Sequence, residues 1–142
     1  MQTDVGATLG VVGERWALLI VRQVSLGRRR FDELQTATGA PRAVLADRLR
    51  RLTDAGILTT RSYRVPGRRT RLEYTLTDAG VDLLPLLAAI ADWGERHRRG
   101  RARRPDADYR HIACGGRVRA QLVCECGQLV SPHAELIAQI NR

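Results

Sequence analysis

The fold of this chain is decided by residues 28–77, which read RRRFDELQTATGAPRAVLADRLRRLTDAGILTTRSYRVPGRRTRLEYTLT. The spacing of apolar residues predicts, in order, a short helix, a turn, a second helix and two strands joined by an arginine-rich tip. That order is typical of a winged helix-turn-helix. We therefore expect a mainly α-helical fold with a small β-wing, in the α+β class.

The second of these helices is the candidate recognition helix. Pro41 suits its first turn, where a missing backbone N–H costs little, and Gly56 ends it. Apolar residues at i, i+4 and i+7 form a core-facing stripe, which comprises Leu45, Leu49 and Leu52. Strands are expected over 57–62 and 71–76, and the Pro66-Gly67 pair favours a turn between them.

Flanking helices are expected on both sides of this unit. A short helix over 5–12 and a buried helix over 14–23 precede it, and a long helix over about 78–98 follows it. Pro85 should bend the long helix. Because this helix is apolar on more than one side, we expect a homodimer in which a second subunit covers it. The residues expected at the dimer interface are Leu9, Val12, Leu83, Leu84, Leu87, Ile90 and Trp93.

The composition changes along the chain and predicts three parts. Residues 1–97 form the winged helix-turn-helix domain with its dimerisation helix at 78–97. Residues 98–105 form an arginine-rich hinge, and residues 106–142 form a small hairpin segment that holds all three cysteines.

The charge of the chain points to a polyanionic partner. The formal net charge is +9, the sequence pI is near 11.0, and all 24 basic residues are arginine. A compositional bias explains the choice of arginine over lysine, but it does not explain why twelve arginines fall within residues 28–77. Clustered basic residues are the electrostatic signature of nucleic-acid binding.

Several functional classes are not expected. No apolar run approaches the ~18 residues of a membrane span, and the first residues lack the pattern of a signal peptide. We therefore expect a cytoplasmic protein without a membrane partner. There is no phosphate loop, no Ser/His/Asp set and no pair of carboxylates in a cleft-like context, so we do not expect an enzyme.

Double-stranded DNA is the expected partner of the recognition helix, whose N-terminal end must enter a major groove about 12 Å wide. Arg42 is the candidate for a base contact, because arginine pairs bidentately with guanine. Asp47 either accepts a hydrogen bond from cytosine or pairs with Arg50 or Arg51. The other arginines are expected to bind phosphates. The predicted DNA contacts are Arg28, Arg29, Arg30, Pro41, Arg42, Ala43, Ala46, Asp47, Arg48, Arg50, Arg51, Arg68, Arg69 and Arg71.

Four segments within residues 9–94 resemble the HxlR-type winged-helix transcription regulators: GERWALLIVRQVSLGRRRFDELQ, VLADRLRRLTDAGIL, EYTLTDAG and LLPLLAAIADWG. The resemblance implies a homodimeric DNA-binding regulator whose flanking helices form the dimer. We expect a repressor that binds a pseudo-palindromic operator, with no effector identifiable from the sequence.

Two departures from the family pattern limit what can be transferred. The family often carries a reactive cysteine about thirteen residues before the tryptophan of its GERW-like motif, and Thr3 stands there in this chain. Redox or aldehyde sensing at that position is therefore not implied. The wing is also about two residues longer than the common family form, so its DNA contacts cannot be transferred residue by residue.

The C-terminal segment carries a second candidate site. His111, Cys114, Cys124 and Cys126 supply four nitrogen or sulfur donors within sixteen residues, which is the number that zinc requires. Three alternatives remain: a structural zinc site, a metal-free hairpin with buried thiols, and thiol redox sensing aided by neighbouring arginines. The corresponding functional alternatives are a metal- or redox-responsive regulator, a non-specific nucleic-acid-binding module and a protein-interaction module.

Overall fold

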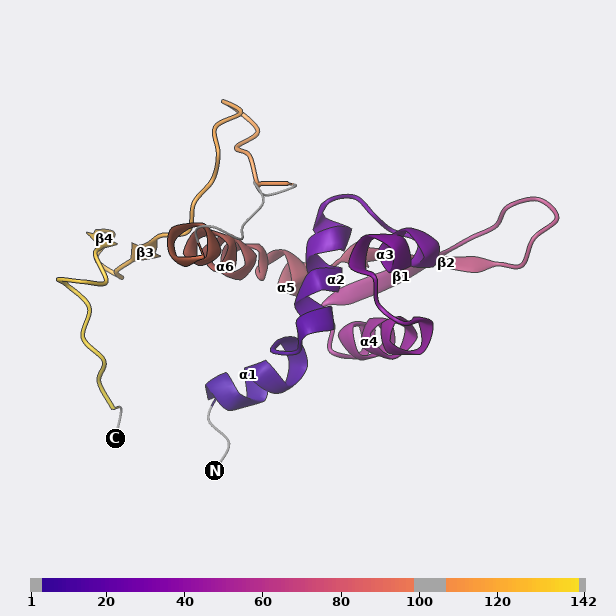
Figure 1. Ribbon diagram of the computed structural model, residues 1–142, viewed down its shortest axis with the longest axis horizontal. Coiled ribbons are helices and arrows are strands. Elements are labelled where there is room, and N and C mark those ends of the chain that lie inside the picture. Colours follow the sequence, from indigo (N-terminus) through magenta and orange to yellow (C-terminus); the bar gives the residue numbers. More distant parts are fainter. Residues whose placement is uncertain (1–3, 99–106, 141–142) are drawn as a thin grey trace. The chain divides into compact units, whose positions relative to one another are not determined.

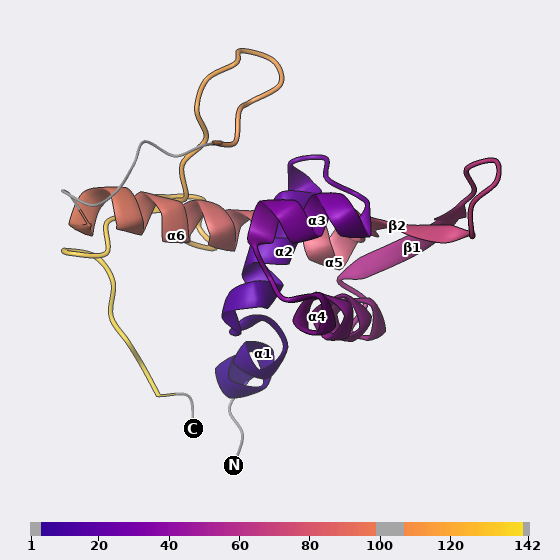
Figure 2. The same ribbon diagram turned by 45° about the vertical axis from the view of Figure 1, so that its right-hand side comes forward.

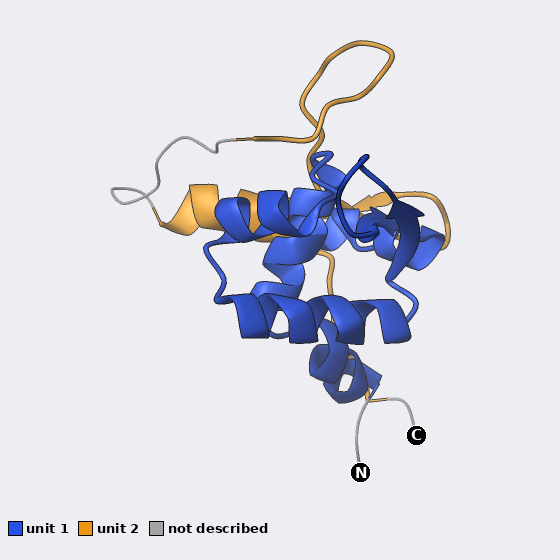
Figure 3. Cartoon of the chain, turned by 90° about the vertical axis from the view of Figure 1, so that its right-hand side faces the viewer, with its two compact units in different colours: residues 1–87 blue, residues 88–142 orange. Residues whose placement is uncertain are grey.

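The structure, a computed structural model, describes residues 4–98 and 107–140. The chain divides into two compact units, residues 1–87 and 88–142 (Figure 3). Most of the predicted hinge, from residue 99 to 105, lies outside the described residues. The boundary between the units falls within the helix α6 (Leu84–His97), which lies inside the predicted first domain, residues 1–97.

The first unit is a helix-turn-helix followed by a two-stranded wing (Figure 1). α3 and α4 form the helix-turn-helix, and β1 and β2 pair antiparallel with Leu58 opposite Leu76 and Tyr63 opposite Arg71. The predicted mainly helical fold with a small β-wing is confirmed. The elements of this unit are α1 (Asp4–Val12), α2 (Arg15–Ser25), α3 (Phe31–Thr38), α4 (Arg42–Asp54), β1 (Leu58–Tyr63), β2 (Arg71–Leu76) and α5 (Asp78–Val81).

Glycines with positive φ end the helices and form the tip of the wing. Gly39 (φ 72°) follows α3 and Gly56 (φ 73°) follows α4, in the left-handed conformation that glycine adopts without a steric penalty. At the tip, Gly67 (φ 77°) follows Pro66, and the Arg68 N–H donates to the Val65 carbonyl at 3.0 Å. The turn predicted from Pro66-Gly67 is therefore present.

The core of this unit is aliphatic, as the low aromatic content requires. The predicted leucine stripe of α4 is buried, and α2 supplies the opposing side chains. The most deeply buried side chains are Ile20, Val21, Leu34, Leu45, Leu49, Leu52 and Leu58. α4 therefore has one face fixed in the core and leaves the other free for a partner.

The prediction of one long, bent helix over 78–98 was wrong. The chain instead forms the short helix α5 and then α6 (Leu84–His97), with Pro85 in the first turn of α6. A proline removes a backbone donor, and its ring clashes with the carbonyl four residues earlier, which here belongs to Val81. In a first turn neither problem arises, because the N–H there has no helical partner.

The second unit contains most of α6 and a short hairpin. β3 (Leu122–Val123) pairs antiparallel with β4 (Leu129–Val130), as the predicted C-terminal hairpin requires. Among the described residues, no helix is long and apolar enough to cross a membrane.

An ion pair between Glu14 and Arg48 joins α4 to the start of α2, which stands beside it in Figure 2. The Glu14 carboxylate accepts from the Arg48 Nε at 2.8 Å and from the Ala17 N–H at the start of α2 at 3.3 Å. The hydrogen bond from Arg48 holds the pKa of Glu14 below its ordinary value. One carboxylate thus caps α2 and fixes the orientation of α4.

We predict that Glu14→Gln lowers the free energy of unfolding by about 0.5–1 kcal/mol at neutral pH, the range of partly exposed ion pairs. A folded-state pKa below the unfolded one stabilises the protein above about pH 4.5, and this contribution is lost as the pH falls below that value. Urea denaturation across this pH range measures the effect. Glu125→Gln, in the exposed tail, is the control, and equal losses in both variants would contradict the prediction.

Candidate nucleic-acid interface

The outer face of α4 carries the residues predicted to approach DNA. Arg42, Ala43, Ala46 and Arg50 are all exposed, on the side away from the buried leucine stripe. Pro41 is also exposed and stands immediately before the helix, in the N-cap position. Small side chains at this end leave room for the helix backbone to approach a groove closely.

Arg42 is held at the start of α4 by two neighbours from α3. Its guanidinium lies 4.9 Å from the centroid of the Phe31 ring, and its Nη1 lies 4.0 Å from Asp32 Oδ1. Stacking on an aromatic face and pairing with a carboxylate both restrict the rotamers of a long side chain. The candidate base-contacting residue is therefore partly ordered in the free chain.

Asp47 binds arginines of its own helix. Its carboxylate pairs with Arg48, with Arg50 Nη2 at 2.7 Å and with Arg51 Nε at 3.0 Å. The hydrogen bond from Arg50, followed by the charge of Arg51, lowers the pKa of Asp47. The salt-bridge alternative is thus what the free chain adopts. Arg48 is the least exposed of these three arginines, because Glu14 also holds it.

The basic turn at residues 28–30 is docked on the wing. The Arg29 carbonyl accepts from the Tyr74 N–H at 2.8 Å, and Arg30 forms an isolated antiparallel bridge with Glu73. The Arg30 guanidinium stacks on the Tyr63 ring at 4.4 Å and pairs with Glu73 at 3.5 Å. The turn before α3 thus pairs with β2 as a short third strand of the wing.

Each end of this basic turn is also fixed to its neighbouring helix. The Arg28 guanidinium donates to the buried Gln23 side chain at 2.7 Å. The Glu33 carboxylate accepts from the N–H groups of Arg29 and Arg30 at 3.0 and 3.1 Å, and these bonds lower its pKa. A glutamate at the third position of a helix commonly reaches back in this way, so the sequence contained this signal.

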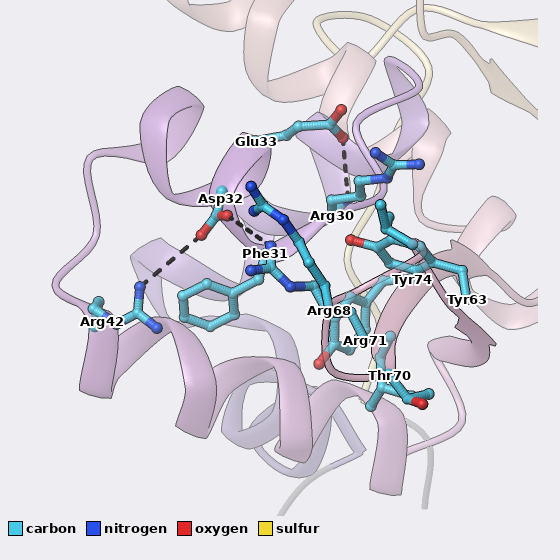
Figure 4. A pocket seen from close by; sticks show the side chains of 12 residues that line it. Arg30, Phe31, Asp32, Glu33, Arg42, Tyr63, Arg68, Thr70, Arg71 and Tyr74 are labelled. Atoms are coloured by element: carbon cyan, nitrogen blue, oxygen red, sulfur yellow. Dashed lines mark hydrogen bonds and ion pairs between the residues drawn. The ribbon is translucent and has the colours of Figure 1, made fainter.

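A groove of about 910 Å³ lies between α3, the start of α4 and the wing (Figure 4). Arg71 enters it from β2 and pairs with Asp32 at 3.3 Å. Figure 4 shows Arg68 extending across it from the wing tip. Among the described residues, no carboxylate forms an ion pair with Arg68. The groove therefore brings Arg30, Arg42, Arg68 and Arg71 together on one surface. Arg69 lies at the exposed tip beside it.

The residues predicted for a dimer interface differ in exposure. Leu9, Ile90 and Trp93 are about half exposed, at 56%, 49% and 56%. Leu83 and Leu84 are partly covered, whereas Val12 and Leu87 are buried within the chain and contribute to its own core. An interface therefore has Leu9, Ile90 and Trp93 available to it.

The donors of the C-terminal segment occupy two turns. His111 Nδ1 lies 3.2 Å from Cys114 Sγ, which also accepts from the Gly116 N–H at 3.4 Å. Cys124 follows β3 and Cys126 lies in the turn that leads to β4, where the Cys126 N–H lowers the pKa of the Cys124 thiol. All three thiols are exposed, which corrects the buried-thiol alternative. Within residues 4–98 and 107–140, no three His, Cys, Asp or Glu side chains gather as a metal site would require.

Comparisons with known proteins agree with this architecture. An HTH-type transcriptional regulator of Mycobacterium tuberculosis, itself uncharacterized, is 38% identical over 129 residues, or 90% of this chain and 80% of that protein. The solved structure of PA1607, described as a candidate transcription factor, is 29% identical and matches with a TM-score of 0.78 over 97% of this chain and 95% of its own. The redox regulator HypR in its reduced form is 28% identical, with a TM-score of 0.61 over 68% of this chain and 95% of its own.

A family model matches the part of the chain that holds the helix-turn-helix and the wing. The model described as HxlR-like helix-turn-helix matches residues 11–101, which is more than half of the chain. The match spans α2, the helix-turn-helix, the wing and α6. It confirms the resemblance seen in the sequence, and the chain belongs to the HxlR-like helix-turn-helix family of transcriptional regulators.

Proposed function

We propose that this regulator binds a specific double-stranded DNA operator through α4 and acts as a homodimeric repressor. The observation that carries the proposal is the exposed face of α4, which begins at Arg42 and adjoins the arginine-lined groove of the wing. A helix with an arginine and two alanines at its N-terminal end suits insertion into a major groove. The wing then lies beside it, with cations for the phosphate backbone.

The two parts of this surface have different tasks. Arg42 is the base-contacting residue, because its side chain is ordered by Phe31 and Asp32 at the helix end that enters the groove. Arg68 is a phosphate contact, because it extends from the wing without an acidic partner among the described residues. Phosphate contacts set affinity and its salt dependence, whereas base contacts set sequence preference.

We predict that Arg42→Ala and Arg68→Ala differ in their effect on sequence preference. Arg42→Ala should weaken binding to the preferred duplex by about 1–3 kcal/mol and leave a scrambled duplex nearly unchanged. Arg68→Ala should weaken binding to both duplexes and reduce the slope of log K against log salt by about 0.9. Fluorescence anisotropy on a duplex enriched by in vitro selection, at several salt concentrations, measures both effects.

Arg119→Ala, in the C-terminal segment, is the matched control with the same loss of charge. If the wild-type protein bound both duplexes equally at physiological salt, it would be a non-specific nucleic-acid-binding module. A regulator should keep a preference of roughly 10³ or more.

The dimer is the second part of the proposal. Ile90 and Trp93 are half exposed on α6, and a second subunit that covers them stabilises the dimer by roughly half of the ~1.5–3 kcal/mol that full burial of a large apolar side chain contributes. Two-fold symmetry then presents two recognition helices to half-sites about one helical turn apart, or a multiple of that distance. A pseudo-palindromic operator is the DNA counterpart of this symmetry.

We predict that native mass spectrometry finds the wild-type protein as a dimer and the double variant Ile90→Glu, Trp93→Glu as a monomer. Ile112→Glu is the control, because Ile112 is fully exposed in the tail, at 102%, and lies off α6. A monomeric wild-type protein, or a double variant that stays dimeric, would contradict this interface. The same spectra report any bound metal and so test the zinc alternative for the tail.

A second candidate function is a thiol-responsive regulator that senses through its C-terminal cysteines. The observation that favours it is the exposed Cys114 thiol, which lies 3.2 Å from an imidazole nitrogen and accepts a backbone N–H. The second exposed pair adds a Cys124 thiol whose pKa is lowered by the Cys126 N–H, and a lowered thiol pKa favours the reactive thiolate. HypR, one of the similar solved proteins, is named as a redox regulator.

We predict that hydrogen peroxide changes operator affinity of the wild-type protein several-fold, and that a reductant reverses the change. The variant with serine at positions 114, 124 and 126 should not respond. An unchanged affinity in oxidised wild-type protein, with thiol oxidation verified by mass, would eliminate this candidate and leave the DNA-binding proposal intact.

A further inference from the structure

One carboxylate at the proposed DNA surface joins three separate elements. Asp32, in the first turn of α3, lies 4.0 Å from Arg42 at the start of α4 and 3.3 Å from Arg71 on β2. Figure 4 shows it between these two arginines at the wall of the groove. Asp47 differs in this respect, because its arginine partners all lie on its own helix.

Stability does not account for this position. The Asp32 side chain is 69% exposed and its arginine partners are 71% and 47% exposed, and ion pairs of this kind contribute little to folding. The backbone N–H groups before α3 are already served by Glu33 rather than by Asp32. The stability of the fold therefore does not explain why an acidic residue lies at this point of the surface.

A carboxylate in a phosphate-binding surface has two consequences. It repels the backbone of every duplex, whatever its sequence, because bulk affinity depends on the net positive charge presented to phosphates. Its charge also attracts the Arg42 guanidinium across 4.0 Å, toward the rotamer in which that group stacks on Phe31 and keeps its donors free for a bidentate acceptor. The first consequence weakens non-specific binding, and the second strengthens binding where a guanine is in register.

We propose that Asp32 is a specificity-determining residue of this regulator, which orients Arg42 toward a base and suppresses binding to non-operator DNA. The inference rests on the proposed function and deepens it. Asp32 forms no part of the predicted DNA contacts, and it acts through Arg42 and Arg71 rather than by touching a base itself. Its ligand class is double-stranded DNA, with guanine opposite Arg42 and a backbone phosphate opposite Arg71.

The test compares Asp32→Asn with Asp82→Asn on the selected and scrambled duplexes over a range of salt concentrations. Asp82 is exposed in the same unit and lies outside the groove, so its variant makes the same change in net charge. We expect Asp32→Asn to bind the scrambled duplex several-fold more tightly and the selected duplex no better or more weakly. The specificity ratio should fall about tenfold, while Asp82→Asn leaves that ratio unchanged.

A second measurement separates orientation of Arg42 from bulk charge. In an Arg42→Ala background, Asp32→Asn should no longer weaken binding to the selected duplex, because the side chain it orients is gone. Thermal unfolding of each variant verifies that folding is preserved, and Asp32→Glu, which retains the charge, should recover most of the discrimination against the scrambled duplex.

Two results would contradict the inference and leave the proposed function intact. Equal gains on both duplexes would make Asp32 a bulk charge, and unchanged affinities on both would remove any role in binding. A wild-type protein that shows no preference between the duplexes would instead contradict the proposed function, and this inference with it. The wild-type ratio therefore tells the two failures apart.

Discussion

Concentrated positive charge is the constraint on which the structure of the first unit depends. Arginines from the basic turn, α4 and the wing meet on one small surface, and their mutual repulsion opposes the compact state. Three carboxylates lie among these arginines: Asp32 between Arg42 and Arg71, Asp47 beside Arg50 and Arg51, and Glu73 between Arg30 and Arg61. These acids offset part of the repulsion between the arginines, although exposed pairs such as those of Asp32 add little to the free energy of folding.

This arrangement explains how the wing keeps a defined orientation toward α3 and α4. A two-stranded hairpin alone is only marginally stable in water. Here the Arg29 carbonyl accepts a hydrogen bond from the Tyr74 N–H, and the Arg30 side chain contacts both Tyr63 and Glu73. The basic turn therefore acts as a short third strand beside the hairpin. The same residues that were predicted to contact phosphates therefore also position the wing, which links the local structure of the turn to the geometry of the whole proposed interface.

The sequence predicted those features that depend on residues close together in the chain. The leucine stripe of α4 follows from helical periodicity, and the tip of the wing follows from Pro66-Gly67. The acid–arginine network could not be predicted, because its members are far apart in sequence: Asp32 and Arg71 are separated by 39 residues and Arg30 and Glu73 by 43. The effect of Pro85 could be predicted only in part. The local rule identified a disturbance in the helix, but the choice between a bend and a break depended on where the next helix could begin.

The C-terminal donors show the same limit for a binding site. Spacing alone places His111, Cys114, Cys124 and Cys126 within reach of one metal, yet the pairs occupy separate turns in the described chain. Zinc stabilises a fold by supplying four bonds to a segment that lacks a core, and such a role requires all four donors to converge. Two exposed turns with separate donor pairs instead leave the thiols accessible to solvent. A redox-sensitive thiol must be reached by its oxidant, and this exposure is the observation on which the proposed thiol response of the tail rests.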